Sequence, residues 1–346
     1  MENKKKVLVT GAGGFIGHHL VTFLKGKGYW VRGVDIKLPE YSEPDTDEFR
    51  LLDLRYWENC LRATEGVDEV YALAADMGGM GYISTHHAEI LYNNATINFH
   101  TLEAARQNGV KRYLYTSSAC IYPEYLQEDA QVTPLKESDA YPAQPQDAYG
   151  WEKLITEILC HHYQNDYQME TRTVRFHNIF GELGTWDGGR EKAPAAMCRK
   201  IALAKMNDQP EIEIWGDGEQ TRSFCYIDDC VEGIYRLMRS DFREPLNLGQ
   251  DRMISINELA EMVADVADFS IEKKHIEGPQ GVRGRNSDND LLREVLGWEP
   301  QISLEEGLAR TYQWIEAQAR ESYKPEKRKS TDAARAVSQA ATVAAV

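Results

Sequence analysis

Tyr149 and Lys153 are the pair of residues in this sequence whose types and spacing most clearly suggest chemistry. A spacing of four places both side chains on one face of a helix. Tyrosine, with an ordinary pKa of about 10, is a poor base at neutral pH, but a neighbouring ammonium group stabilises the phenolate and lowers that pKa. Ser118 follows the apolar run at residues 112–116 and could bind the same substrate hydroxyl group. Together these side chains predict a site that removes the proton of an alcohol.

A glycine-rich turn near the N-terminus offers a place for a hydride acceptor. Gly11, Gly14 and Gly17 lie between a β-rich run at residues 7–10 and a helical stretch at residues 18–25. Glycines let the backbone approach a pyrophosphate, and the N-terminus of the following helix attracts the anion. A glycine pattern also occurs in plain turns, but this one has a strand-like run before it and a helical pattern after it. The turn therefore predicts a dinucleotide-binding site.

Asp35 ends the second apolar run, at the spacing expected for a carboxylate that binds the diol of a ribose. The same carboxylate would repel a 2′-phosphate, so the sequence favours NAD over NADP. An acidic residue at the end of a strand is also common in turns. The further cofactor candidates are individually weaker and lie beside the glycine turn, after later strands or at the catalytic pair: Phe15, Ile16, Asp53, Ala74, Tyr149 and Lys153.

The order of elements predicts an α/β fold with a doubly wound parallel sheet. Apolar runs of strand length alternate with helical patterns through the first half of the chain. Residues 1–180 are expected to form the dinucleotide-binding domain, to which later strands return from the region of residues 220–250. Residues 181–322 are expected to form mainly a smaller, mixed α/β substrate lobe. Residues 323–346 lack apolar periodicity and predict a disordered tail.

Composition excludes several classes of function. The net charge of −16 argues against a nucleic-acid partner, because a phosphate backbone selects for a basic face. No apolar run is long enough to span a bilayer, so no membrane association is expected. The beginning of the chain has no signal-peptide pattern, which predicts a cytoplasmic protein. The six cysteines include no CxxC pair, and no metal site is predicted.

The glycine turn, the strand-end serine and the YxxxK pair, in this order, resemble the extended short-chain dehydrogenase/reductase family, and in particular its members that act on nucleotide sugars. This resemblance implies a Rossmann-type domain, a tightly held NAD and a C-terminal lobe for the nucleotide sugar. It also implies a homodimer built through the helices near residues 87–107 and 149–165.

Four longer strings narrow the resemblance to members of this family that invert two ring carbons of a nucleotide sugar, C3 and C5. They are LAADMGGMG at residues 73–81, SSACIYP at 117–123, GGREKAPAA at 188–196 and GVRGRNSD at 281–288. The implied substrate is GDP-mannose and the implied products are GDP-L-galactose and GDP-L-gulose. A transient ketone at C4 would make the hydrogens at C3 and C5 acidic enough to remove.

The narrower resemblance gives Cys120 and Lys192 the roles of base and acid in the two inversions. Taken without it, Cys120 is more typical of a packed cysteine at a strand end, and Lys192 of a surface charge. A thiolate is a plausible base because adjacent positive charge lowers the thiol pKa from its free value of about 8.5. Two arginines within matched strings would bind phosphate oxygens. The implied substrate residues are Gly78, Ser118, Ala119, Cys120, Asn178, Glu191, Lys192, Ala193, Lys200, Gln220, Thr221, Arg222 and Arg285.

Two alternatives remain open at this stage. The nearer one is another nucleotide-sugar enzyme of the same family, a 4-epimerase, a dehydratase or a decarboxylase. A dehydratase typically carries an acidic residue after the strand-end serine, where this chain has Ala119 and Cys120. The more distant alternative is a non-catalytic regulator that senses NAD. Such proteins often lose the tyrosine or the lysine of the YxxxK pair, and this chain has both.

Overall fold

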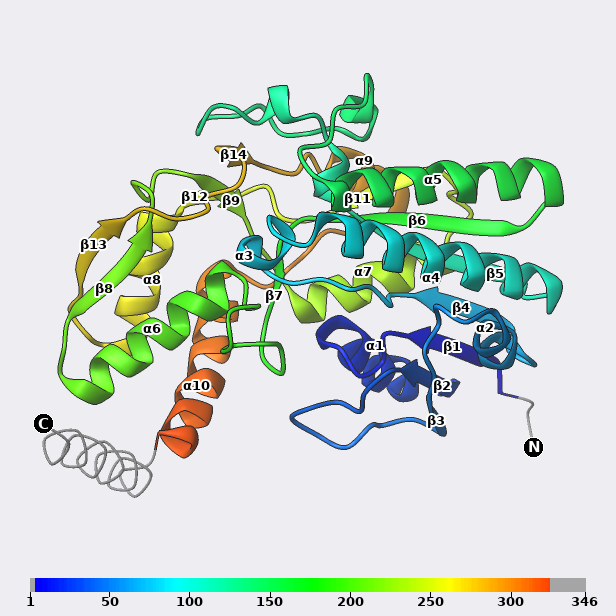
Figure 1. Ribbon diagram of the computed structural model, residues 1–346, viewed down its shortest axis with the longest axis horizontal. Coiled ribbons are helices and arrows are strands. Elements are labelled where there is room, and N and C mark those ends of the chain that lie inside the picture. The colour runs from blue at the N-terminus through cyan, green and yellow to red at the C-terminus, as the bar shows by residue number, and fades with distance from the viewer. Residues whose placement is uncertain (1–3, 324–346) are drawn as a thin grey trace, which may run out of the picture.

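The computed structural model describes residues 4–323, without the side chain of Met80, and its centre is a seven-stranded parallel sheet (Figure 1). The strands lie in the order β11-β6-β5-β4-β1-β2-β3, and every neighbouring pair is parallel. This confirms the predicted doubly wound sheet. The strands are β1 (Lys6–Thr10), β2 (Trp30–Asp35), β3 (Glu48–Leu51), β4 (Glu69–Ala72), β5 (Arg112–Ser118), β6 (Glu170–Phe176) and β11 (Pro245–Leu248).

Helices cover both faces of this sheet, which is why its central strands read as continuous apolar runs. Along β1, Val7 and Val9 face one core, and Leu8 faces the other. The core of Val7 and Val9 includes helices α1 (Phe15–Gly26) and α7 (Ile227–Arg239). The core of Leu8 includes α2 (Trp57–Thr64), α4 (His87–Gln107) and α5 (Ala148–Tyr167).

The later part of the chain also forms three smaller sheets, two of which lie with a group of helices on the left of Figure 1. Three of these helices pack against one another: α6 (Ala193–Asn207), α8 (Ile256–Ala267) and α10 (Leu304–Ser322). The smaller sheets pair β8 (Glu211–Trp215) with β13 (Glu272–Ile276), β7 (Ile179–Phe180) with β10 (Cys225–Tyr226), and β9 (Thr221–Ser223) with both β12 (Met253–Ser255) and β14 (Gly284–Arg285). The short helices are α3 (Met80–Ile83) and α9 (Asp290–Leu296).

Local boundaries differ from the expected ones where polar contacts redirect the chain. The apolar run at residues 69–74 leaves the sheet after Ala72, because the amides of Leu73 and Ala74 donate to Thr10 Oγ1. The apolar run at residues 223–227 does not form one strand, since β9 and β10 pair with different partners. At α10, Ser303 Oγ caps the helix by accepting from the Glu306 amide.

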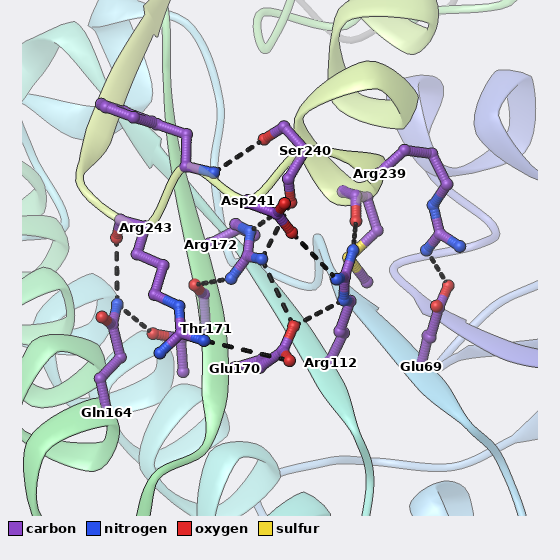
Figure 2. A network of polar contacts seen from close by, with 12 residues as sticks. Glu69, Arg112, Gln164, Glu170, Thr171, Arg172, Arg239, Ser240, Asp241 and Arg243 are labelled. Carbon is purple, nitrogen blue, oxygen red and sulfur yellow. Dashed lines mark hydrogen bonds and ion pairs between the residues drawn. The ribbon is translucent and has the colours of Figure 1, made fainter. Parts of the chain in front are cut away.

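A polar network holds the amino ends of β4, β5 and β6 together at the edge of the sheet away from the glycine turn (Figure 2). Arg172, whose side chain is fully buried, donates to the carbonyl oxygen of Ser240 at the end of α7, at 2.9 Å. Arg239, in the last turn of α7, pairs with the buried carboxylate of Glu69. These contacts fix the end of α7 against the amino ends of the strands, opposite the edge where the strands end.

Most of the residues predicted to be functional lie at or beyond that opposite edge. Thr10, Asp35 and Ser118 are the last residues of β1, β2 and β5. Ligands bind at the carboxyl ends of the strands in open α/β sheets. No helix in residues 4–323 is long and apolar enough to cross a membrane. The predicted tail at residues 323–346 lies, apart from Tyr323, outside the described residues.

Candidate active site

The turn between β1 and α1 is shaped by very close backbone approaches. A Cβ atom on Gly17 would lie 2.0 Å from the carbonyl oxygen of Gly11, and one on Gly13 would lie 2.2 Å from that of Lys37. Gly11 itself has a φ of +70°, which favours glycine. Gly14 is the N-cap of α1, and no side chain caps the helix there. The first amides of α1, including those of Phe15 and Ile16, are therefore free to bind an anion.

Asp35 is held rigidly at the end of β2. Its carboxylate accepts hydrogen bonds from the amides of Gly13, at 2.9 Å, and Ile36, at 2.7 Å. Burial raises the pKa of Asp35, and these amides act in the opposite direction. The next side chain, Ile36, is 71% exposed. Sequence reasoning missed it, although an apolar residue directly after the acid was visible and offers a surface on which an adenine ring could stack.

The two weaker cofactor candidates have partners within the protein. Asp53 follows β3, but its carboxylate binds Arg55 at 2.7 Å, and this ion pair lowers the pKa of Asp53. An adenine amino group would have to share that carboxylate. The amide of Ala74 donates to Thr10 Oγ1 at 3.1 Å, which brings the chain after β4 close to the glycine turn.

Tyr149 and Lys153 lie in the first half of α5, which begins with Asp147 accepting from the Gly150 amide. The Lys153 ammonium group donates to the carbonyl oxygen of Thr116 at 3.0 Å and lies 5.4 Å from the centroid of the Tyr149 ring. The Tyr149 hydroxyl is near Met77 Sδ, at 3.6 Å. The predicted pair is therefore brought together, with Lys153 buried.

The pKa of Tyr149 is raised well above its ordinary value, first by burial and then by Cys120 and Glu152, while a hydrogen bond with Ser118 lowers it. This direction is opposite to the one expected from Lys153 in the sequence. A positively charged nicotinamide ring beside the hydroxyl would also lower the pKa.

Cys120 follows Ser118 in a short 3₁₀ turn (Ala119–Ile121), and its amide donates to Ser118 Oγ at 3.2 Å. The other five cysteines are buried, whereas Cys120 is partly exposed. Arg285 Nη1 donates to Cys120 Sγ at 3.2 Å. This contact places a positively charged donor beside the sulfur atom of Cys120. Cys120 is therefore placed as a reactive thiol rather than as a packed one.

Lys192 is the N-cap residue of α6 and is exposed at the surface of the site. Desolvation by the surrounding protein nevertheless lowers the pKa of Lys192, and the charge of Cys120 opposes this shift. A lysine with a lowered pKa gives up a proton more readily at neutral pH.

The cationic candidates share one feature, which is that none of them pairs with a carboxylate in residues 4–323. Arg222 instead donates to backbone carbonyls, among them that of Val282 at 2.6 Å. Burial lowers the pKa of Arg222 to about 9, and the nearby charge of Arg285 acts in the same direction. Ammonium and guanidinium groups without a carboxylate partner, in a chain of net charge −16, indicate a binding site for an anion. The residues concerned are Lys153, Lys192, Lys200, Arg222 and Arg285.

Comparison with known proteins agrees with this geometry. The sequence matches the NAD dependent epimerase/dehydratase family over residues 7–249. The chain belongs to this family. The family's cofactor is NAD, and the open amides of α1, the glycine cradle and the fixed carboxylate of Asp35 fit it.

Relatives within the family include an epimerase of high identity. The GDP-mannose 3,5-epimerase of Arabidopsis thaliana is 56% identical over 329 residues, which cover 94% of this chain and 85% of that protein. The structure of UDP-glucose 4-epimerase from Thermotoga maritima, with UDP-glucose, has a TM-score of 0.81 at 26% identity and covers 90% of this chain and 99% of that one. UDP-glucuronic acid 4-epimerase from Bacillus cereus, in complex with UDP-glucuronic acid and NAD, has a TM-score of 0.76 at 26% identity, with coverages of 90% and 99%.

Two of the strings that suggested this family in the sequence touch one another in the structure. The Gly79 amide donates to the carbonyl oxygen of Arg190 at 3.0 Å, and a Cβ on Gly79 would lie 2.5 Å from the Glu191 carbonyl oxygen. The Arg190 guanidinium group stacks on the ring of Tyr82, 3.8 Å from its centroid. This contact brings the loop of Lys192 against the loop that follows β4.

Several residues predicted to bind substrate already have an ion-pair or hydrogen-bond partner within the protein. Glu191 binds Arg199 at 2.7 Å, and Asn178 Nδ2 donates to the Ser223 carbonyl oxygen at 2.8 Å. Gln220 differs, since its buried Oε1 has no hydrogen-bond partner among the described residues and could accept one from a ligand. The remaining candidates lie in the loops and strands around Cys120 or in α6 and β9: Gly78, Ala119, Ala193, Lys200 and Thr221.

Proposed function

We propose that this enzyme converts GDP-mannose into GDP-L-galactose, and into GDP-L-gulose, by inverting C3 and C5 through a transient ketone at C4. The observation that carries this proposal is Cys120, a partly exposed thiol 3.2 Å from Arg285 Nη1. An epimerase that inverts only C4 has no need for a second acid–base pair. The 56% identity to GDP-mannose 3,5-epimerase over 94% of the chain supports the same reaction and substrate.

Tyr149 begins and ends the proposed reaction. Its phenolate takes the proton of the C4 hydroxyl, and its partners Ser118 and Lys153 orient the hydroxyl group and stabilise the negative charge. NAD held by the glycine turn and Asp35 would supply a reversible hydride acceptor for C4, so that the complete reaction involves no net oxidation. The Lys153 ammonium group is fixed by the Thr116 carbonyl oxygen, at 3.0 Å, which keeps the charge beside the tyrosine ring.

The inversions require a base on one face of the sugar ring and an acid on the other. The C4 ketone acidifies the hydrogens on C3 and C5, so that the Cys120 thiolate can remove one of them. Lys192 then donates a proton to the opposite face of the same carbon, and its positive charge stabilises the enolate between the two steps. Arg222, Arg285 and Lys200 carry the unneutralised charge that the diphosphate needs.

Incubation of the purified enzyme with GDP-mannose in D₂O should place deuterium at both C3 and C5, observed by NMR. Each inversion replaces a carbon-bound hydrogen with one that has exchanged with solvent through Cys120 and Lys192. UDP-glucose under the same conditions serves as the control and should gain no deuterium. Inversion of C4 without deuterium at C3 or C5 would instead identify a simple 4-epimerase, and the absence of any exchange would leave an NAD-binding protein without this activity.

We also propose that the enzyme is a homodimer joined through α4 and α5, which lie side by side in Figure 1 and pack against each other. Large apolar side chains on these two helices are between 37% and 70% exposed. Three of them follow a spacing of four and three along α5 and so share one helix face. An apolar patch of this kind on a monomer marks an interface. Its residues are Leu91, Tyr92, Phe99, Trp151, Ile155 and Ile158.

Ile158→Arg is expected to convert the dimer into monomers. In a two-fold symmetric interface each protomer would bury its own arginine, so two positive charges would be taken out of water without a partner. Sedimentation velocity at micromolar concentration measures the change. Leu51→Arg on β3 is the matched control, since Leu51 is an exposed apolar residue outside α4 and α5. A dimer that persists in Ile158→Arg, or a wild-type chain that sediments as a monomer, would place any interface elsewhere.

A cytoplasmic location is part of the same proposal. All six cysteines are free, so none of them forms a disulfide with another. Free thiols are typical of proteins kept in a reducing compartment.

A further inference from the structure

Gln127 is a buried glutamine, 1% exposed, that sequence reasoning did not select. Its Oε1 accepts a hydrogen bond from Arg285 Nε at 2.5 Å, and its Nε2 donates to the carbonyl oxygens of Tyr122 and Pro123, both at 3.1 Å. The amide can have only this orientation. A rotation by half a turn would place its N–H groups against the guanidinium group and its oxygen against two carbonyl oxygens.

The backbone of Gln127 holds the same strand that carries Arg285. Its carbonyl oxygen accepts hydrogen bonds from the amides of Arg283, at 2.9 Å, and Gly284, at 3.1 Å. Gly284 leaves no space between β14 and this segment, because a Cβ there would lie 2.2 Å from the Asp129 carbonyl oxygen. Gln127 therefore contributes both to the position of β14, which also pairs with β9, and to the direction of the Arg285 side chain.

The guanidinium group of Arg285 is planar, so two fixed nitrogens determine the third. Nε is held by Gln127 and Nη1 donates to Cys120 Sγ at 3.2 Å. Nη2 has no hydrogen-bond partner in residues 4–323. Without Gln127, the long arginine side chain would lose the contact that selects this orientation and would be free to turn away from the thiol.

We propose that Gln127 is a positioning residue that aims Arg285, so that one nitrogen of the guanidinium group donates to the Cys120 thiolate and another stays open to the substrate anion. This inference rests on the proposed function, in which Cys120 removes the proton from the sugar. The simpler possibility is that Gln127 only braces the loop of residues 120–127. Only in the first of these two possibilities does Gln127 affect Cys120 through Arg285.

Alkylation of Cys120 by iodoacetamide distinguishes them without requiring turnover. The other five cysteines are buried, so the rate in the folded holoenzyme reports on Cys120. Three variants form a double-mutant cycle: Gln127→Met, Arg285→Lys and the two combined. Each single variant should slow alkylation at neutral pH by about tenfold, the effect of losing one hydrogen bond to a charged group. The double variant should be no slower than Arg285→Lys.

Gln164→Met is the matched control. Gln164 Nε2 also makes two hydrogen bonds, to Thr171 Oγ1 and to the Arg243 carbonyl oxygen, but in the network of Figure 2. Cys120 in the Gln164→Met variant should be alkylated at the wild-type rate. Retention of NAD and the melting temperature check that each variant is folded. If Gln127→Met does not fold, Gln127→Asn keeps an amide with a shorter reach and should give the same non-additive pattern.

The proposal is overturned if Gln127→Met is alkylated at the wild-type rate. It is also overturned if the double variant is slower than Arg285→Lys by the same factor that Gln127→Met shows alone, because Gln127 would then act independently of Arg285. Deuterium exchange from GDP-mannose is measured separately. A non-additive alkylation cycle in an enzyme without exchange at C3 and C5 would contradict the proposed function and leave the role of Gln127 intact.

Discussion

Cys120→Ala is expected to lower deuterium incorporation at C3 and C5 of GDP-mannose by roughly 100- to 10,000-fold, the usual contribution of a general base. The variant removes the thiolate but none of the groups that act on the C4 hydroxyl. Tyr149 and Lys153 keep their contacts with Met77 and the Thr116 carbonyl oxygen. Oxidation at C4 should therefore continue, and reduced NAD should accumulate on the protein.

The absorbance of reduced NAD and the NMR spectrum of the recovered sugar measure these two results in one sample. Cys160→Ala is the matched control, because Cys160 is also in the part of the chain that forms the large sheet and its helices, but lies within α5 and is buried in the core. It should lose some stability and keep its exchange activity. Exchange at the wild-type rate in Cys120→Ala would remove Cys120 from the mechanism.

Tyr149→Phe should abolish both oxidation at C4 and exchange at C3 and C5, again by roughly 100- to 10,000-fold. Without the hydroxyl there is no group to take the C4 proton, so the ketone that acidifies the neighbouring hydrogens does not form. The structural cost should be small, since the hydroxyl contacts only Met77 Sδ and the Ser118 side chain among the described residues, and the ring stays buried.

The comparison between the two variants is the sharper measurement. In Cys120→Ala, the bound NAD should become reduced, but no deuterium should enter C3 or C5. In Tyr149→Phe, NAD should stay bound, but it should not become reduced and no deuterium should enter the sugar. Tyr163→Phe, at the other end of α5, is a control for loss of a tyrosine hydroxyl, since that hydroxyl binds Glu103 at 2.9 Å. Exchange at C3 or C5 in Tyr149→Phe would show that the hydrogens are removed without prior oxidation at C4.

The parts of the fold that the sequence predicted best are those specified by neighbouring residues. The helix expected at residues 87–107 has those bounds in the structure, because Asn108 and Gly109 end it locally. The two-sided burial of β1 was visible as a continuous apolar run. The division of β9 from β10 was not visible, since it depends on pairing with β7 and β12, which lie far away in the sequence.

The candidate site, like the fold, has parts that neighbouring residues specify and parts that depend on residues far away in the sequence. The glycine turn, Asp35 and the YxxxK pair are local motifs, and the structure places them at one edge of the sheet. Gln127 could not be found from the sequence, because the residue it orients, Arg285, lies 158 positions away. Arg285 itself was predicted as a phosphate ligand, and its contact with Cys120 adds a second role that no local pattern encodes.

Strand β11 (Pro245–Leu248) returns to the edge of the large sheet beside β6 only after the chain has formed β8, β9 and β10 elsewhere. We retain as a proposal the division into an NAD-binding part up to residue 180 and a substrate part at residues 181–322. These parts could not be exchanged between related enzymes at a single junction, because a hybrid joined there would set the β6 of one parent against the β11 of the other. Recombination of such enzymes, in the laboratory or in evolution, therefore requires two crossovers that move β11 together with α7.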